Sequence, residues 1–568
     1  MKLKLIQMPF VTDLNNSYDF NASSLLPLSI ATLAASLRNN GFNVDVDDLN
    51  IKAHRDKRID LKIFFDLNRC INHISNGNDI EIGKVIEQML HKTDMNGYDV
   101  FLLSYSRSWN LGTKGMFLAF NHYIKKNFGG IIIAGGMTNT NKDFQLLNLL
   151  MKDKSILDYL ITGYGEDSII KLLKALMCGK PEENIEGLVY SRGKIIRQEI
   201  NKPYKMAVPY NLKIRPDFDG LPLDLYKRRI NGDDVFIIPL KLNEGCPYSC
   251  AFCYESVRIK NIKTINLKEF IDFIKNLKEK YNTPFFSFLD STFNTSKKFV
   301  EDFCHEIINS GLKIYWNDSA RLDRHIFTDE VIELMRKAGC IHLVFGLESA
   351  SQRMLNFIKK GVTLENASAI LKKTSEVGIW NGINLIAGLP FEKEEDIDNT
   401  VEFINSHRDF IDECWYYAFY LEKESDFYKN PGKYGLENIQ RLYKKNFKDR
   451  ELYNSIYFAK YFRYSFDEAY GLKWPEKLKQ INCSYLKLRS NIKINHILPS
   501  YNHFPVLFYL YNQYDIKNKI KSEYFKIKKR MLFKFMLKPR SVYRHIYNHP
   551  TMHNPIQNLN FKLKALLS

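Results

Sequence analysis

Apolar and polar positions alternate regularly over the first third of the chain. Helix-like stretches such as 27–39 separate short apolar runs that are typical of buried strands. These runs are residues 3–8, 42–47, 99–104, 131–136 and 158–163. Strands that alternate with helices favour a parallel sheet covered on both faces, whose ligands bind beyond the carboxyl ends of the strands. We therefore predict a doubly wound α/β domain over residues 1–185.

The same alternation of strands and helices returns in residues 233–425. Its helices are clearest at 267–281 and 329–338, and Thr328 can cap the second. Its candidate strands are residues 235–242, 284–289, 313–316, 342–346, 382–387 and 413–419. Six strand–helix units predict a partial (β/α)6 barrel of the TIM type, with its chemistry at the carboxyl ends of the strands.

Two further segments complete the predicted organisation. Residues 186–232 are predicted to be a linker that begins with a hairpin over 187–199, with its turn at Arg192–Gly193. Four prolines follow the hairpin, as expected of an extended crossing segment. Residues 426–568 are rich in Tyr, Phe, Lys and Asn and are predicted to form a mainly helical C-terminal domain.

Composition places the chain among folded proteins of the reducing cytoplasm. With 568 residues it is too long for one ordinary domain, and 45% hydrophobic and 26% charged residues exclude a disordered or collagenous chain. No apolar run is long enough to span a bilayer, and the first ten residues lack a signal-peptide core. Nine scattered cysteines are not the pattern of a disulfide-stapled secreted protein.

The basic excess of the chain is confined to its last quarter. Residues 431–568 hold 27 Lys and Arg against 8 Asp and Glu, whereas the remainder is nearly neutral. Such a segment suits an anionic partner such as nucleic acid, a membrane surface or an acidic peptide, or it is a solvated helical region without a partner. Residues 521–540 could lie on an anionic surface, but an amphipathic helix packed on the barrel with snorkelling lysines is the favoured interpretation.

The sharpest chemical signal is the stretch EGCPYSCAFCYES at residues 244–256. It places Cys246, Cys250 and Cys253 on one loop directly after a candidate strand. Three thiolates this close can bind three irons of an iron–sulfur cube and leave the fourth iron open to a substrate. Structural zinc would need a fourth ligand, but the next cysteine, Cys304, lies more than fifty residues on. The loop therefore predicts a [4Fe-4S] cluster.

The cysteine spacing, with Phe252 at the aromatic position, resembles the C-x3-C-x-aromatic-C signature of the radical S-adenosylmethionine (radical SAM) family. Further stretches resemble the family's strand regions two to five in the right order: FFSFLDSTF (285–293), WNDSARLD (316–323), FGLESASQRMLNFIKKG (345–361) and NLIAGLP (384–390). The resemblance implies that S-adenosylmethionine (SAM) contacts Phe252, Asp290, Arg321, Glu348, Asn384 and Gly388.

The front domain resembles the cobalamin-binding domain, a Rossmann-like fold, that precedes the barrel in one large radical SAM class. The corresponding stretches are LLPLSIATLAASLRNNGFNVDVDD (25–48), IIIAGGMTNT (131–140) and ITGYGEDSIIKLL (161–173). The residues implied to contact cobalamin are Ser104, Gly135, Gly136, Gly163 and Glu166. No D-x-H-x-x-G occurs in residues 1–185, so the lower face of the cobalt is expected to be empty or hydrated.

Together these resemblances imply a cobalamin-dependent C-methyltransferase. The reduced cluster would cleave SAM to a 5′-deoxyadenosyl radical, which abstracts hydrogen from an unactivated carbon of a peptide or natural product. Methylcobalamin would then supply the methyl group, and a second SAM would remethylate the corrin. The expected partners are that substrate, with the basic C-terminal region as its specificity element, and an electron donor such as flavodoxin or ferredoxin.

Three alternatives remain open. The same cofactors could serve a rearrangement or an oxidation without methyl delivery. A tRNA-modifying radical SAM methylthiotransferase is disfavoured, because its second cluster needs three front-domain cysteines and only Cys70 and Cys178 lie there. A protein that only binds nucleic acid or a membrane through its basic C-terminal region would not need the three clustered cysteines.

Overall fold

The structure is a computed structural model. It describes residues 1–11, 25–56, 58–76, 79–105, 111–136, 156–163, 165–179, 184–192, 195–198, 212–230, 233–255, 262–442 and 464–494. The chain forms two compact units, Met1–Leu240 and Lys241–Ser568, and each is described by itself. In the described ranges, none of the helices combines the length and the apolar character that a membrane span requires.

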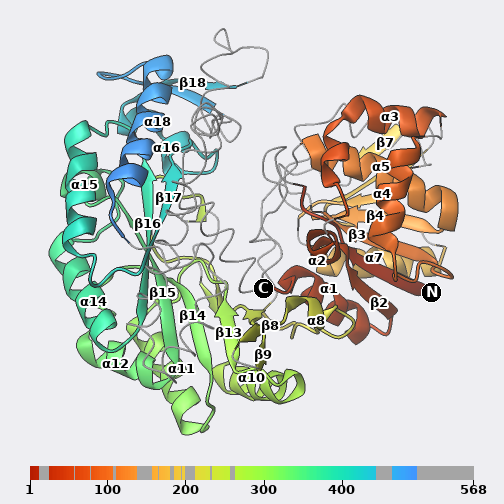
Figure 1. Cartoon of the computed structure of the whole chain (residues 1–568), viewed down its shortest axis with the longest axis horizontal. Helices are drawn as coiled ribbons and strands as arrows, with labels where there is room; N and C mark the ends of the chain where they lie inside the picture. The colour runs from red at the N-terminus through yellow and green to blue at the C-terminus, as the bar shows by residue number, and fades with distance from the viewer. Residues whose placement is uncertain are drawn as a thin grey trace, which may run out of the picture. The chain divides into compact units, whose positions relative to one another are not determined.

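The first unit contains a seven-stranded sheet in the order β2-β1-β3-β4-β5-β6-β7 (Figure 1). Its parallel strands are β1 (Lys2–Gln7), β2 (Asn43–Asp48), β3 (Val100–Ser104), β4 (Ile131–Gly135) and β5 (Tyr159–Ile161). β6 (Leu188–Arg192) and β7 (Ile195–Gln198) add an antiparallel hairpin at one edge. The five predicted strands and the hairpin are confirmed, although Arg192 pairs with Ile195 and so belongs to the strand rather than to the turn.

Helices connect the strands of this sheet along the chain. They are α1 (Leu28–Asn39), α2 (Leu49–Arg55), η2 (Leu61–Phe65), α3 (Leu67–Asn76), α4 (Ile80–Leu90), α5 (Leu111–Phe128) and α7 (Glu166–Met177). The strand order reverses at β1, so the carboxyl ends of β1 and β3 form the switch point where doubly wound sheets bind ligands. Ser104 lies at this edge, in register with Gln7 on one side and Gly135 on the other.

The end of the predicted linker packs on the first unit. Asp217 forms an ion pair with Arg38 of α1 at 2.5 Å. The short helix α8 (Leu223–Tyr226) contacts α2, and the Tyr226 hydroxyl donates to Asp48, the N-cap residue of α2. Burial raises the pKa of Asp48 to about 6. Two short strands, β8 (Arg228–Ile230) and β9 (Asp233–Val235), follow as an antiparallel pair.

The barrel is a six-stranded sheet whose order follows the chain. Its strands are β10 (Ile238–Leu240), β13 (Phe285–Phe288), β14 (Tyr315–Ala320), β15 (Cys340–Glu348), β16 (Trp380–Ala387) and β17 (Glu413–Ala418). Its helices are α10 (Leu267–Tyr281), α11 (Lys297–Asn309), α12 (Asp329–Lys337), α13 (Gln352–Phe357), α14 (Leu364–Glu376) and α15 (Glu394–Ser406). Each predicted strand is present, β13 to β17 are parallel, and the predicted partial barrel is confirmed.

Local signals explain two of these helices. The Asn266 side chain accepts a hydrogen bond from the Glu269 amide at the start of α10, and Asn282 ends that helix in the left-handed region at φ +49°. Thr328 caps α12, as predicted, by accepting from the Val331 amide. Helices α11, α12, α14 and α15 cover one face of the sheet (Figure 1), and Trp316 of β14 packs against Phe303 of α11 on that face.

The described part of the C-terminal segment contains strands as well as helices. β18 (Leu436–Arg441) and β19 (Tyr464–Glu468) form an antiparallel pair, and α18 (Trp474–Asn491) follows them. α16 (Asp426–Lys429) and η4 (Pro431–Tyr434) lead into this pair, and α18 packs on β16, β17 and α15. Residues 521–540 lie outside the described residues, so the partner of the basic region stays a prediction.

Candidate functional site

The cysteine loop follows β11 (Asn243–Glu244), which pairs with β12 (Lys263–Thr264). Among the described residues, Cys246, Cys250 and Cys253 form no disulfide; Cys250 is buried and the other two are half-buried. The loop backbone is fixed at Ala251, whose amide donates to Ile358 at 2.9 Å and whose carbonyl accepts from Phe427 at 3.0 Å. The loop is therefore held between the end of α13 and the start of α16.

Asp290, which follows β13, holds the chain that leads into this loop. Its carboxylate accepts from the amides of Leu242 at 2.9 Å and Asn243 at 3.2 Å, and from the Asn243 side chain at 2.8 Å. Burial raises the pKa of Asp290 to about 7, and burial and the charge of Asp290 raise the pKa of the neighbouring Asp318 well above its ordinary value. Burial and the proximity of the two carboxyls thus both favour the protonated form of this pair. The implied SAM contact of Asp290 stays a prediction.

Arg321 brings a positive charge to the buried cysteine. Its Nη1 lies 3.2 Å from the Cys250 Sγ, and its guanidinium stacks 3.9 Å from the Tyr248 ring centre. Asn294 fixes the Arg321 backbone with two hydrogen bonds: its Oδ1 accepts from the Arg321 amide at 2.8 Å, and its Nδ2 donates to the Arg321 carbonyl at 2.9 Å. Arg321 therefore donates directly to the sulfur of a predicted cluster ligand.

Glu348 ends β15 in a strained conformation. Its φ is +70°, and the register with β16 shifts between Gly346 and Glu348. Its Oε1 lies 2.9 Å from the Nζ of Lys360, and both side chains are buried. A Cβ at Gly346 would lie 2.5 Å from the Glu348 Oε1, so the strand needs glycine there to leave room for the ion pair.

Lys360 is a site residue that the sequence reasoning missed. Burial lowers its pKa, but the charges of Glu348 and Cys250 outweigh burial and hold the pKa above its ordinary value. Its Nζ also lies 5.8 Å from the Phe252 ring centre. Its neighbour Lys359 is exposed and pairs with Asp426, and nothing in the sequence separates the two lysines. Lys360 joins Phe252, Arg321 and Glu348 in one cluster around Cys250.

Asn384 and Gly388 lie on the next strand and turn. Asn384 of β16 is in register with Gly346, and its buried Oδ1 has no hydrogen-bond donor among the described residues. Gly388 follows the strand at φ +82°, and its amide donates to Glu392 at 2.7 Å. An acceptor oxygen without a donor at the carboxyl end of the sheet suits a ligand with hydroxyl or amino groups.

The donor set around the loop fits an iron–sulfur cluster. Within the described ranges no three His, Cys, Asp or Glu side chains gather around a single-ion position. Thiolates that bind separate irons of one cube are spread more widely than ligands of one zinc ion. Three cysteines, one of them beside two buried cations, therefore fit a cube with one open iron.

The predicted cobalamin residues share the carboxyl edge of the first sheet. Ser104 and Gly135 are in register, and Gly163 is at φ +90° with open space where a Cβ would lie. Gly136 needs glycine for a different reason, because a Cβ there would collide with the Tyr105 carbonyl. Glu166 opens α7, and burial raises the pKa of its carboxyl. Small residues and open space at this edge fit a large flat ligand, although the individual contacts stay predictions.

Comparisons with known proteins identify the barrel. The model of the radical SAM superfamily matches residues 240–404. An uncharacterized methyltransferase of Pyrococcus horikoshii is 32% identical over 256 residues, which are 45% of this chain and 54% of the relative. The anaerobic magnesium-protoporphyrin IX monomethyl ester cyclase of Rubrivivax gelatinosus is 26% identical over 275 residues, 48% of each chain. The chain thus spans about half the length of these curated relatives.

Two solved structures resemble both units of the chain. The radical SAM methyltransferase TsrM from Kitasatospora setae has a TM-score of 0.53 at 15% identity, over 77% of this chain and 78% of that one. The cobalamin-dependent radical SAM enzyme OxsB has a TM-score of 0.50 at 17% identity, over 76% of this chain and 56% of that one. These likenesses show the fold alone.

The class of protein follows from the fold and the family match. The chain is an α/β protein in which a doubly wound domain precedes a radical SAM barrel, the fold of cobalamin-dependent radical SAM enzymes. Residues 240–404 match the model of the radical SAM superfamily, and this match agrees with the [4Fe-4S] cluster and SAM that the cysteine loop predicts.

Proposed function

We propose that the protein is a cobalamin-dependent radical SAM methyltransferase that acts on an unactivated carbon of a peptide or natural product. The observation that carries this proposal is the buried set of Arg321, Glu348 and Lys360 around Cys250, at the carboxyl ends of the barrel strands. A buried carboxylate and two buried cations beside a cluster loop suit a zwitterionic ligand, which presents an amine and a carboxylate together.

Each residue has a defined task in this proposal. Cys246, Cys250 and Cys253 would hold the cluster, and the cluster would supply an iron without a protein ligand as the position for SAM. The strained backbone of Glu348 directs its carboxylate toward Lys360, and Arg321 keeps a positive charge beside Cys250. When bound, the reduced cluster supplies the electron that cleaves SAM, and methylcobalamin supplies the methyl group.

Relatives support methyl transfer as the reaction. Besides the Pyrococcus protein, the bacteriochlorophyllide d C-12(1)-methyltransferase of Chlorobaculum tepidum is 23% identical over 321 residues, 56% of this chain and 62% of the relative. We further propose a cytoplasmic protein that receives its electrons from a flavodoxin or a ferredoxin.

A second candidate is an oxidation with the same cofactors and without methyl delivery. The similarity to anaerobic magnesium-protoporphyrin IX monomethyl ester cyclases, at 25–27% identity, favours it. The two candidates differ in their products, because only methyl transfer converts a second SAM to S-adenosylhomocysteine.

The test is anaerobic reconstitution with iron and sulfide, followed by incubation with SAM, cobalamin and a strong reductant. The expected products are 5′-deoxyadenosine and, only with cobalamin, S-adenosylhomocysteine, both quantified by mass spectrometry. Cys250→Ala should lose the cluster and both products, whereas Cys483→Ala, which removes an exposed cysteine on α18, should retain them.

Other outcomes separate the candidates. 5′-Deoxyadenosine without S-adenosylhomocysteine would favour the oxidation. S-adenosylhomocysteine without 5′-deoxyadenosine would keep methyl transfer and overturn the radical route. A wild-type chain that takes up no cluster would refute the proposal.

A further inference from the structure

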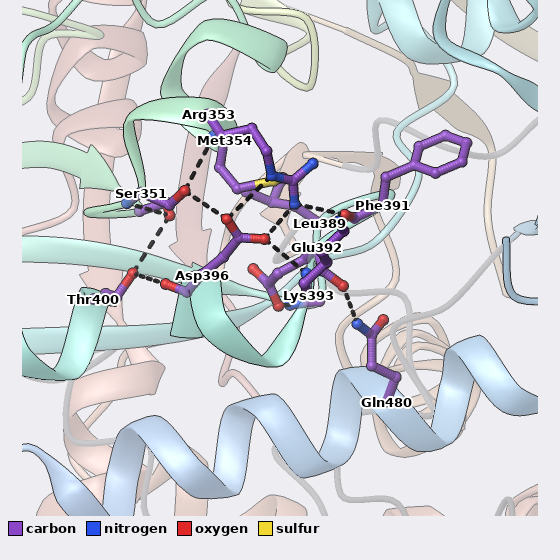
Figure 2. Close-up of polar contacts among 12 residues, drawn as sticks. Ser351, Arg353, Met354, Leu389, Phe391, Glu392, Lys393, Asp396, Thr400 and Gln480 are labelled. Atoms are coloured by element: carbon purple, nitrogen blue, oxygen red, sulfur yellow. Dashed lines mark hydrogen bonds and ion pairs between the residues drawn. The ribbon is translucent and has the colours of Figure 1, made fainter. Parts of the chain in front are cut away.

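The turn from β16 to α15, residues 388–393, is held by side chains at nearly every backbone position. Phe391 adopts φ +56° in this turn, a conformation that a bulky residue keeps only when its surroundings enforce it. The Phe391 amide donates to Glu468 at 2.7 Å, and its carbonyl accepts from Arg353 at 2.8 Å. Figure 2 shows Arg353 reaching Phe391 and Asp396, and the Asp396 carboxylate in turn accepts from the Lys393 amide at 2.7 Å.

Three of the contacts that hold the turn come from residues of the C-terminal segment. Lys477 of α18 donates to the Leu389 carbonyl at 2.6 Å, and Gln480, one turn later, donates to the Glu392 carbonyl (Figure 2). Glu468 of β19 supplies the third contact, to the Phe391 amide. These residues lie more than seventy positions beyond the turn that they hold.

Lys477 lies at the centre of the contacts between the C-terminal segment and the turn. Its side chain is 0% exposed, and its Nζ lies 2.8 Å from the Glu468 Oε1 and 2.7 Å from the Gln480 Oε1. Burial lowers the pKa of Lys477, and the charges of Glu468 and Glu392 oppose that effect. Burying a lysine ammonium group costs desolvation free energy, which the three oxygen partners must offset. The side chain is therefore stable only while these three contacts are in place.

The turn packs so closely against α18 that there is no room for a side chain at Gly388. A Cβ built on Gly388 would lie 2.7 Å from the Cα and 2.8 Å from the Cβ of Ile481. The Gly388 amide also donates to Glu392, whose carboxyl is buried beside Lys477. The glycine turn and α18 therefore form one packed body.

We propose that Lys477 is a positioning residue for SAM, and that α18 is part of the SAM site because it shapes the Gly388 turn. This inference rests on the proposed function and on the predicted contact of Gly388 with SAM. Lys477 itself does not touch SAM; it fixes the Leu389 carbonyl and the Glu468 carboxylate, which together set the turn.

The test compares three variants of the full chain, reconstituted with its cluster. Lys477→Met removes the buried charge and keeps the length of the side chain. Lys479→Met is the matched control, since Lys479 is an exposed lysine on the same helix. Gln480→Met removes the contact to the Glu392 carbonyl and the hydrogen bond that Gln480 accepts from Lys477, but keeps the buried charge of Lys477.

The measured quantities are the Kd of SAM by calorimetry, the KM for SAM and the rate at which saturating SAM is cleaved to 5′-deoxyadenosine. Lys477→Met should raise Kd and KM about tenfold, with the rate at saturation within about twofold and the iron content unchanged. Gln480→Met should raise Kd about threefold, and Lys479→Met should match the wild type.

Each outcome decides the matter. A folded Lys477→Met protein with wild-type Kd would overturn the inference. If that variant does not fold, Gln480→Met decides, and an unchanged Kd there would overturn it equally. A wild-type chain that holds the cluster but binds no SAM would overturn the proposed function itself, and the inference with it.

Discussion

One methyl group at Gly388 probes how tightly α18 is packed on the barrel. Gly388→Ala introduces a Cβ at φ +82°, where an L residue is strained, and directs it at the backbone of Ile481. The left-handed conformation costs about 1–2 kcal/mol. The added Cβ would also lie 2.7 Å from the Ile481 Cα. This overlap adds about 1–3 kcal/mol, because the backbone of a helix moves aside less easily than the end of a side chain.

Gly311 provides a control for the conformational part of this cost. It ends α11 at φ +66°, and a Cβ there would meet nothing within 4 Å. Gly311→Ala should therefore lose about 1–2 kcal/mol, and Gly388→Ala about 2–5 kcal/mol. Truncation of Ile481 to Ala should not rescue Gly388→Ala, because the Cα and Cβ that would clash remain.

Urea unfolding followed by hydrogen exchange in the second unit measures both losses, since a chain of two units need not unfold in one step. Equal losses for Gly388→Ala and Gly311→Ala would refute the packing argument. Rescue by Ile481→Ala would show that only the end of the Ile481 side chain opposes the added methyl group.

Two further predictions concern buried charges. Burial raises the pKa of Glu392 from 4.5 to about 7. The contribution of the protonated carboxyl to stability is therefore fully present below pH 4.5, the unfolded pKa, and is lost as the pH rises through 7, the folded pKa. The unfolding free energy of wild type relative to Glu392→Gln should thus fall by about 3 kcal/mol over that range; a pH-independent difference would contradict this assignment. Lys360→Met strands the buried Glu348 carboxylate and should cost about 3–5 kcal/mol in denaturant unfolding. Lys360→Met combined with Glu348→Gln should recover most of that loss, and a double variant as unstable as the single one would contradict the pairing.

Local pattern was sufficient for the strands of the two main sheets, although it missed the antiparallel pair β18 and β19. The apolar run at 285–288 becomes β13, and helix 267–281 has the predicted bounds because Asn266 and Asn282 are strong end signals within the chain itself. The cysteine loop was found in the same way, from residue type and spacing, whereas Glu348 was singled out only by the resemblance to a known family. Such features depend on neighbours close in sequence, which is what a pattern records.

Buried charges could not be predicted in this way. Lys360 and Lys477 are buried, whereas Lys359 and Lys479 are exposed, and composition treats all four alike. A lysine is buried only where the fold brings an acceptor close to it from a distant part of the chain. For Lys477 that acceptor is the Leu389 carbonyl, 88 residues away. The same limit applies to Asp290, whose hydrogen bonds to residues 242 and 243 span more than forty positions.

The basic C-terminal segment illustrates why net charge alone is a weak guide to partners. In its described part, Lys473 pairs with Glu437, Lys487 with Glu394, and Lys477 with Glu468, so several lysines serve the fold of the second unit. Two of these pairs lie within residues 431–494, and the third joins α18 to α15 of the barrel. A lysine already paired with a carboxylate attracts an external anion only weakly, because the new contact must displace the old one. An anionic partner of this segment would therefore bind through lysines and arginines other than these three. The variants Lys477→Met and Lys479→Met separate the role of a buried lysine in the barrel from the role of an exposed lysine at the surface.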